Sequence, residues 1–123
     1  KSLSRLKFWG TVLSNIHYNP SSGFACAVLK QEDMKTHQAT EEDCEGLANF
    51  LIHALAGSTR GIIVLREQEN GTIKGSFRTV DALLNVEKIA KMVGVSGGGG
   101  HKKAAGFTLP GTIQKTPSGF QVA

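Results

Sequence analysis

The chain of 123 residues is poor in cysteine and lacks several common sequence motifs of catalysis. Its two cysteines, Cys26 and Cys44, are too few for the disulfide framework of a small secreted domain, so we predict free, structural thiols. The first turn of a predicted helix holds Cys44, a position that can lower a thiol pKa, but no His or second Cys stands at a catalytic spacing. No apolar run approaches the roughly 18 to 20 residues of a membrane-spanning helix, which excludes such a helix.

Metal-binding and nucleophile motifs are also missing. There is no GK[ST] sequence of a P-loop and no local signature of a Ser-His-Asp triad. The few aspartates and histidines do not stand at metal-ligand spacing. We therefore predict that this chain by itself binds no metal and catalyses no reaction.

The bulk composition is that of a soluble globular protein, with 40% hydrophobic and 20% charged residues. A chain of this length forms one domain, which we assign to residues 1–123. The sequence starts at Lys1 without an initiator methionine and without a basic-then-apolar leader. We expect it to be a fragment of a longer cytoplasmic protein.

Positive charge is concentrated in the second half of the chain. The net charge is +4, yet residues 1–59 hold five Lys and Arg against six Asp and Glu, a net charge of −1. Residues 60–123 hold nine against four, a net charge of +5. This half is suited to an anionic ligand such as a nucleotide or a nucleic acid end, although a basic, merely soluble surface would have the same balance.

Four consecutive glycines, Gly97 to Gly100, precede His101 in the basic half. Glycine lets the backbone approach a ligand closely, and Lys102 and Lys103 add positive charge. We expect the run to lead into a short helix whose N-terminal N–H groups hold a phosphate. The alternative is a flexible linker, but the run lies between two apolar periodic segments and not at a change of composition.

The remaining pattern predicts an α+β domain, with two main helices packed on one face of a mainly antiparallel or mixed sheet. A helix begins after Thr40, which with Asp43 approximates a capping box, and it ends at Gly57. Asn70-Gly71 is a strong hairpin signal. Strands are predicted over 6–16, 24–29, 61–65, 72–79 and 107–109, a helical turn over 31–36, a second helix over 86–93 and a terminal hairpin over 113–123.

One segment resembles a known family. GGGGH followed by two variable residues and AAG resembles the motif of the DHHA1 domain, the C-terminal substrate-binding domain of DHH-family phosphoesterases. The upstream Ser76-Phe77-Arg78-Thr79 resembles the S-x-R segment of the same family. The likeness is tight over residues 74–109 and looser over most of the chain, and Gly94-Val95-Ser96 depart from the family by separating the helix from the glycines.

The resemblance implies a substrate-binding role for the motif residues. Arg78 and His101 would hold a phosphate or the adjoining sugar and base. Backbone N–H groups of Gly98, Gly99 and Gly100 would approach the phosphate, and Ser76 and Thr79 would add hydroxyl contacts. Ala104, Ala105 and Gly106 would be small so that a helix packs tightly behind the loop.

The resemblance also implies partners and a cofactor. The parent protein would carry an N-terminal DHH domain that binds manganese and hydrolyses phosphodiesters, and a homodimer of the parent is one option that stays open. The ligand of this chain would be a short oligonucleotide or a small phosphorylated nucleotide, as in the nanoRNase and pAp-phosphatase type; a cyclic dinucleotide and polyphosphate stay open. Two rival functions are an RNA-binding module like the C-terminal domain of alanyl-tRNA synthetase and a scaffold without ligand.

Overall fold

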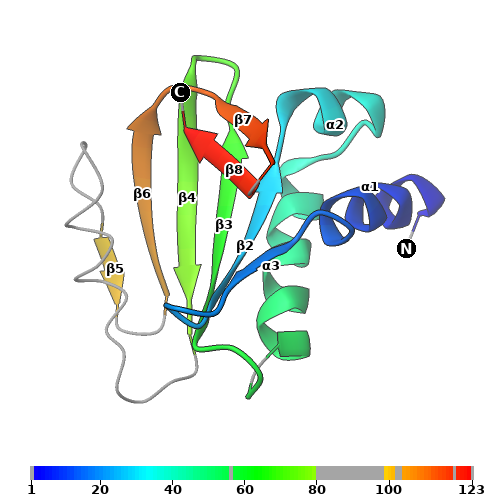
Figure 1. Ribbon diagram of the computed structural model, residues 1–123. Coiled ribbons are helices and arrows are strands. Elements are labelled where there is room, and N and C mark those ends of the chain that lie inside the picture. The colour runs from blue at the N-terminus through cyan, green and yellow to red at the C-terminus, as the bar shows by residue number, and fades with distance from the viewer. Residues whose placement is uncertain (1, 56, 80–98, 102–103, 118, 123) are drawn as a thin grey trace.

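The computed structural model describes residues 2–55, 57–79, 99–101, 104–117 and 119–122 (Figure 1). Within them, six strands form one sheet in the order β1-β2-β3-β4-β6-β5, and β7 pairs with β8 in a separate hairpin. The elements in chain order are α1 (Leu3–Leu13), β1 (His17–Asn19), β2 (Phe24–Leu29), α2 (Gln31–Thr36), α3 (Glu41–Leu55), β3 (Gly61–Glu67), β4 (Thr72–Arg78), β5 (Gly99–His101), β6 (Ala104–Pro110), β7 (Ile113–Thr116) and β8 (Gly119–Val122).

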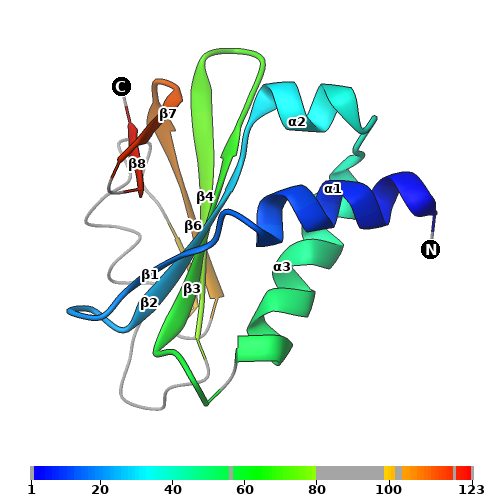
Figure 2. The same ribbon diagram turned by 45° about the vertical axis from the view of Figure 1, so that its right-hand side comes forward.

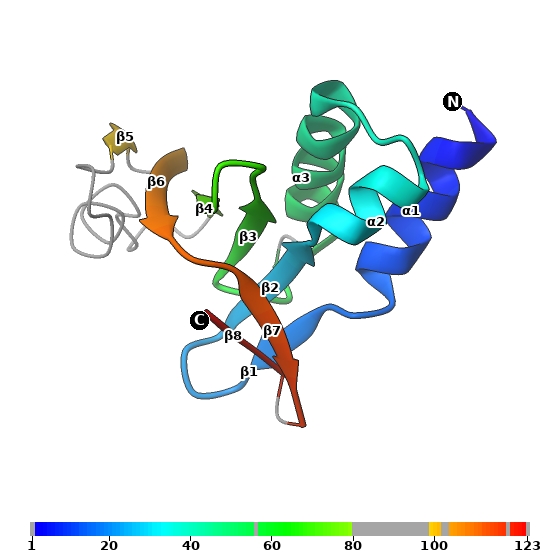
Figure 3. The ribbon, with the colours of Figure 1, turned by 90° about the horizontal axis from the view of Figure 1, so that it is seen from above.

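The sheet separates two layers. Helices α1, α2 and α3 lie on one face, and the hairpin β7–β8 crosses the opposite face (Figures 2 and 3). The pairing of β2 with β3 is parallel, whereas the other pairs of the sheet are antiparallel. The predicted α+β class with a mixed sheet is confirmed, as are the hairpin at Asn70-Gly71 and the C-terminal hairpin.

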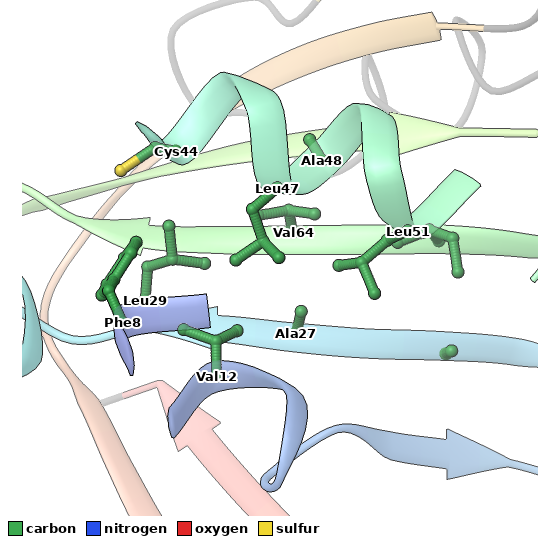
Figure 4. Packing of buried hydrophobic residues seen from close by; sticks show 11 residues of the cluster. Phe8, Val12, Ala27, Leu29, Cys44, Leu47, Ala48, Leu51 and Val64 are labelled. Atoms are coloured by element: carbon green, nitrogen blue, oxygen red, sulfur yellow. The ribbon is translucent and has the colours of Figure 1, made fainter. Parts of the chain in front are cut away.

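The main core lies between the helices and strands β2 and β3 (Figure 4). Phe8 and Val12 of α1 meet Leu47 and Leu51 of α3 above Leu29 of β2, and all five side chains are buried. Alanines at the other inward positions of β2 let the helices approach the sheet closely. Burying each large side chain contributes about 1.5 to 3 kcal/mol, so this layer accounts for a large share of the fold's stability.

The N-terminal segment corrects one prediction. Residues 6–16 were expected to form a strand, but Leu3–Leu13 is a helix whose first turn is capped by the Ser2 hydroxyl, which accepts from the Arg5 amide. Phe8 and Val12 are four residues apart, a spacing that suits one helix face and also one strand face. As a helix, the segment buries Phe8 and Val12 in the same core as the apolar residues of α3, and this packing favours the helix.

Helix α3 begins as predicted. The Thr40 hydroxyl accepts a hydrogen bond from the Asp43 amide at 3.1 Å, and the Asp43 carboxylate accepts one from the Thr40 amide at 3.0 Å. This reciprocal pair is a capping box, with aspartate in the place of the usual glutamate. The helical turn expected over 31–36 is present as α2.

The segment after the glycines corrects a second prediction. A short helix was expected from His101 through Ala105, but Gly99–His101 and Ala104–Pro110 are strands that pair with each other. The small residues of β6 therefore pack in a sheet and not behind a helix. Two parts of the prediction lie outside the described residues: the helix over 86–93, and the positions of Gly97, Gly98, Lys102 and Lys103.

Candidate phosphate-binding site

Strand β4 lies where the sequence predicts a strand over 72–79, and its two faces differ in burial. Its residues Ile73, Gly75 and Phe77 are buried, and the residues between them are half-buried. Arg78 is paired with Ile62 of β3, which belongs to the core beneath the helices. Cross-strand partners share a face of a sheet, so the polar face of β4 lies on the helix side of the sheet.

Arg78 and His101 belong to one cross-strand row. Arg78 of β4 is paired with Ala104 of β6, and Ala104 is paired in turn with His101 of β5. Two strand spacings of about 4.8 Å separate the outer positions by roughly 10 Å. The residues that the family motif singled out, 23 positions apart in sequence, are thus brought to the same level of the sheet.

The adjoining row holds Ser76, Gly106 and Gly99 in the same order of strands. The middle residues of the two rows, Ala104 and Gly106, are small, so β6 presents little side-chain bulk between β4 and β5. Their small size was expected to serve helix packing, but both residues lie in a strand. Their spacing of two residues, alternating with the buried Ala105 and Phe107, was the available signal for a strand.

The guanidinium of Arg78 has one contact within the described part of the chain. Its Nη1 donates to the Phe77 carbonyl oxygen at 3.1 Å, and no carboxylate of the described residues lies within ion-pair distance. A guanidinium has five N–H donors, so most of the hydrogen-bonding capacity of Arg78 is left for a ligand. Its planar fork suits the two oxygens of a phosphate.

Thr79 occupies a different environment from Ser76 and Arg78, which are half-buried. Its side chain is buried, and its hydroxyl donates to the Arg60 carbonyl oxygen at 2.6 Å. This bond joins the end of β4 to the residue that precedes β3. The structure therefore shows Thr79 as a support for the backbone next to Arg78.

At the opposite end of β4, Lys74 and its cross-strand partner Arg66 of β3 both lie next to the carboxylate of Glu41. Arg66 donates twice to the Glu41 carboxylate, at 2.7 and 3.0 Å, and Lys74 lies 3.9 Å from the same carboxylate. The hydrogen bonds from Arg66 lower the pKa of Glu41. An anion would meet a carboxylate here, which leaves the Arg78 end of the strand as the better place for a phosphate.

A cavity of about 430 Å³ lies away from this row, between α2, the start of α3 and the end of β3. Glu41, Glu67 and Glu69 line it together with Lys35 and Arg66. Three carboxylates against two cations make it a poor site for an anionic ligand. We therefore place the candidate site at the cross-strand row and not in this cavity.

The cysteines are free, and neither is activated. Burial raises the pKa of Cys26 to about 11 and also raises that of Cys44. The start of a helix can lower the pKa of a thiol, but at Cys44 desolvation by burial raises the pKa and outweighs the opposing hydrogen bond with Arg66. Within the described ranges no three His, Cys, Asp or Glu side chains gather as a metal site, and no helix is long and apolar enough to cross a membrane.

Comparison with known proteins agrees with this architecture. The DHHA1 domain family matches residues 21–118, so the chain belongs to the DHHA1 domain family. A solved structure of an exopolyphosphatase-related protein from Bacteroides fragilis has a TM-score of 0.78 and 30% sequence identity, with 91% of this chain and 31% of that chain covered.

A second solved structure, a pGpG-specific phosphodiesterase from Vibrio cholerae, shares the fold with a TM-score of 0.58 at 15% identity, over 87% of this chain and 33% of that chain. The chain thus spans about a third of the length of both solved structures. A comparison with curated proteins found no match.

Proposed function

We propose that this DHHA1 domain holds the phosphate and base of a short oligonucleotide or a small phosphorylated nucleotide for a DHH phosphoesterase. The observation that supports the proposal most strongly is the row Arg78–Ala104–His101, in which two phosphate-binding residue types flank a small residue. The family membership and the net charge of +5 over residues 60–123 point the same way.

Each motif residue has a role in this proposal. Arg78 grips a phosphate with two parallel charge-assisted hydrogen bonds, and His101 donates from a ring nitrogen. Gly98, Gly99 and Gly100 carry no side chains that would keep the ligand away, and those of their backbone N–H groups that β6 does not use would be the donors. Ser76, in the adjoining row, offers a hydroxyl to the sugar or phosphate, and Thr79 keeps the end of β4 in position.

The hydrolytic step belongs to a DHH domain in this proposal. Manganese bound there would supply Lewis-acid activation of the phosphodiester and of a water. The described residues of this chain do not fit such a metal, because they bring no ligand cluster together. The chain by itself would therefore bind and orient the substrate without cleaving it, in a parent protein that we expect to be cytoplasmic and to form a homodimer.

A titration of the chain with three ligands tests the proposal. A 5′-phosphorylated dinucleotide and pAp should bind weakly, and their affinity should fall as salt rises, because ionic contacts dominate. Binding of tRNA alone would favour the RNA-binding module. Absence of binding by all three ligands at low salt would favour a scaffold.

A matched pair of variants makes the titration specific to the site. Arg78→Ala should abolish most of the affinity, whereas Lys35→Ala, on exposed α2 and away from the row, should leave it unchanged. Equal losses in both variants would indicate attraction to the overall charge of the chain and would contradict the assigned site.

A further inference from the structure

Helix α1 has a second apolar face that the core does not use. Phe8 and Val12 point into the core, whereas Leu3 and Leu6 are 68% and 51% exposed. At 100° per residue, Leu3, Leu6 and Gly10 fall within one sector of about 60° on the outer side of the helix. A helix that only covers a core would carry polar residues in this sector.

The apolar sector continues onto α3. Trp9 packs against Phe50, with ring centroids 5.3 Å apart, and Phe50 is 45% exposed. Trp9 is fixed in place, because its Nε1 donates to the Asp43 carbonyl oxygen at 3.1 Å. We call Leu3, Leu6, Trp9, Gly10 and Phe50 the α1–α3 apolar patch.

Gly10 has no internal explanation within the described part of the chain. A Cβ at this position would meet nothing within 4 Å, and the φ angle is not in the left-handed region. Gly46 on α3 is a useful contrast, since a Cβ there would collide with the Arg5 guanidinium. Glycine is less favourable than alanine inside a helix, and a close approach from outside the chain would account for Gly10.

The size of the patch indicates what covers it. Three helical turns of α1 extend over roughly 16 Å, with one neighbouring ring from α3. A stable dimer of free copies buries about 800 Å² per partner, more than these few side chains offer. A covalently joined domain needs much less contact, because its effective concentration is in the millimolar range.

We propose that the α1–α3 apolar patch docks the DHH domain, with an apolar side chain of that domain packing against the bare backbone at Gly10. This inference rests on the proposed function, which supplies that domain. The relative from Bacteroides fragilis has more than two thirds of its chain beyond the matched part, enough for such a domain. The patch lies on the helix side of the sheet, the same side as Arg78, so a docked domain would be on the side that carries the phosphate row.

Three variants of the protein containing this chain and its DHH domain test the docking. Leu6→Glu puts a charge into the patch, and Gly10→Leu puts a bulky side chain where the partner would approach the backbone. Lys7→Glu is the matched control, because Lys7 is an exposed neighbour in the same helix, outside the apolar sector. The melting temperature of the 123-residue chain should stay within a few degrees for all three variants, since none of these side chains is in the core.

Small-angle scattering of the two-domain protein then reports docking. Leu6→Glu and Gly10→Leu should enlarge the radius of gyration and lower kcat/KM at least tenfold, while Lys7→Glu should change neither. An unchanged radius in the first two variants would overturn the proposal. So would a dimer of the 123-residue chain, seen by light scattering, that Leu6→Glu dissociates, because the occupant would then be a second copy.

Nucleotide binding separates this inference from the proposed function. Leu6→Glu should leave the affinity of the 123-residue chain for pAp unchanged, whereas Arg78→Ala should lower it. If the wild-type chain binds no nucleotide, the proposed function fails, yet the scattering still decides whether the domains dock.

Discussion

The ring of Phe107 lies directly over Gly75, its cross-strand partner on the face of the sheet away from the helices. Phe77 extends this contact, with its ring centroid 5.2 Å from that of Phe107. The bare backbone at Gly75 thus provides the space for an aromatic cluster behind the polar face of β4. The position of Arg78 on the opposite face depends on this packing between β4 and β6.

The same substitution should have opposite effects at two glycines. Gly75→Ala should lower the free energy of unfolding by about 1 to 3 kcal/mol, because the methyl group would overlap the Phe107 ring. Gly10→Ala should raise it by up to about 1 kcal/mol, because alanine is the better helix former and meets no atom there. Urea unfolding measures the change in the free energy of unfolding for each variant. A Gly75→Ala variant more stable than the wild type would contradict the packing of Phe107 over Gly75.

Buried Glu67 should be needed to hold two segments to the end of β3. Its carboxylate accepts a hydrogen bond from the backbone N–H of Gln31 at 2.9 Å and another from the backbone N–H of Ile113 at 2.7 Å. Glu67→Gln replaces one acceptor oxygen with a donor, so we expect a loss of about 1 to 3 kcal/mol in the free energy of unfolding. Glu69→Gln, at an exposed position two residues later, is the control and should change it by less than about 0.5 kcal/mol.

The ion pair of Glu41 should make a small, pH-dependent contribution to stability. Because hydrogen bonds from Arg66 lower the pKa of Glu41 in the folded state, the contribution is present above the ordinary pKa of 4.5 and is lost as the pH falls through the lowered value. Glu41 is exposed and screened by solvent, so Glu41→Gln should cost no more than about 1 kcal/mol at pH 7. Thermal unfolding of both proteins should converge below about pH 3; a difference that persists there would indicate another cause.

Much of the fold could be predicted from local patterns. The capping box of Thr40 and Asp43, the hairpin at Asn70-Gly71 and the strand predicted over 72–79 each depend on residues close in sequence, and each is confirmed. The first helix could not be predicted in this way, because its apolar residues serve two faces and Gly10 interrupts the pattern. Helix α1 packs on α3, which is distant in sequence, and the local spacing of apolar residues cannot show such a contact.

The candidate site was predictable in its residues but not in its geometry. The motif singled out Arg78 and His101, yet the helix expected after the glycines would have placed them differently. Pairing of β6 with both β4 and β5 creates the row, and such pairing is decided by partners far apart in sequence. The environment of Thr79 likewise depends on a distant residue, since its hydroxyl donates to the carbonyl oxygen of Arg60, 19 residues earlier.

Replacing Arg78 should weaken ligand binding without unfolding the chain. Arg78→Ala removes a fork of charge-assisted hydrogen bonds, so the free energy of binding to pAp should fall by roughly 1.5 to 3 kcal/mol. Arg78→Lys should restore only part, because an ammonium lacks the planar fork. Calorimetry gives the binding, and a melting temperature measured on the same samples should stay nearly constant; lost stability with intact binding would support a purely structural role.

Replacing His101 should weaken binding in a manner that depends on pH. An ordinary imidazole has a pKa of about 6.5, so its positive charge is populated below that value and lost above it. The wild-type chain should therefore bind a phosphate more tightly as the pH falls from 8 to 6, and His101→Ala should lose most affinity below about pH 6.5. His53→Ala, at an exposed position on α3, should keep the wild-type profile. If His101→Ala instead keeps the full gain in affinity at low pH, titration of the phosphate itself explains the profile and His101 is not a charged contact.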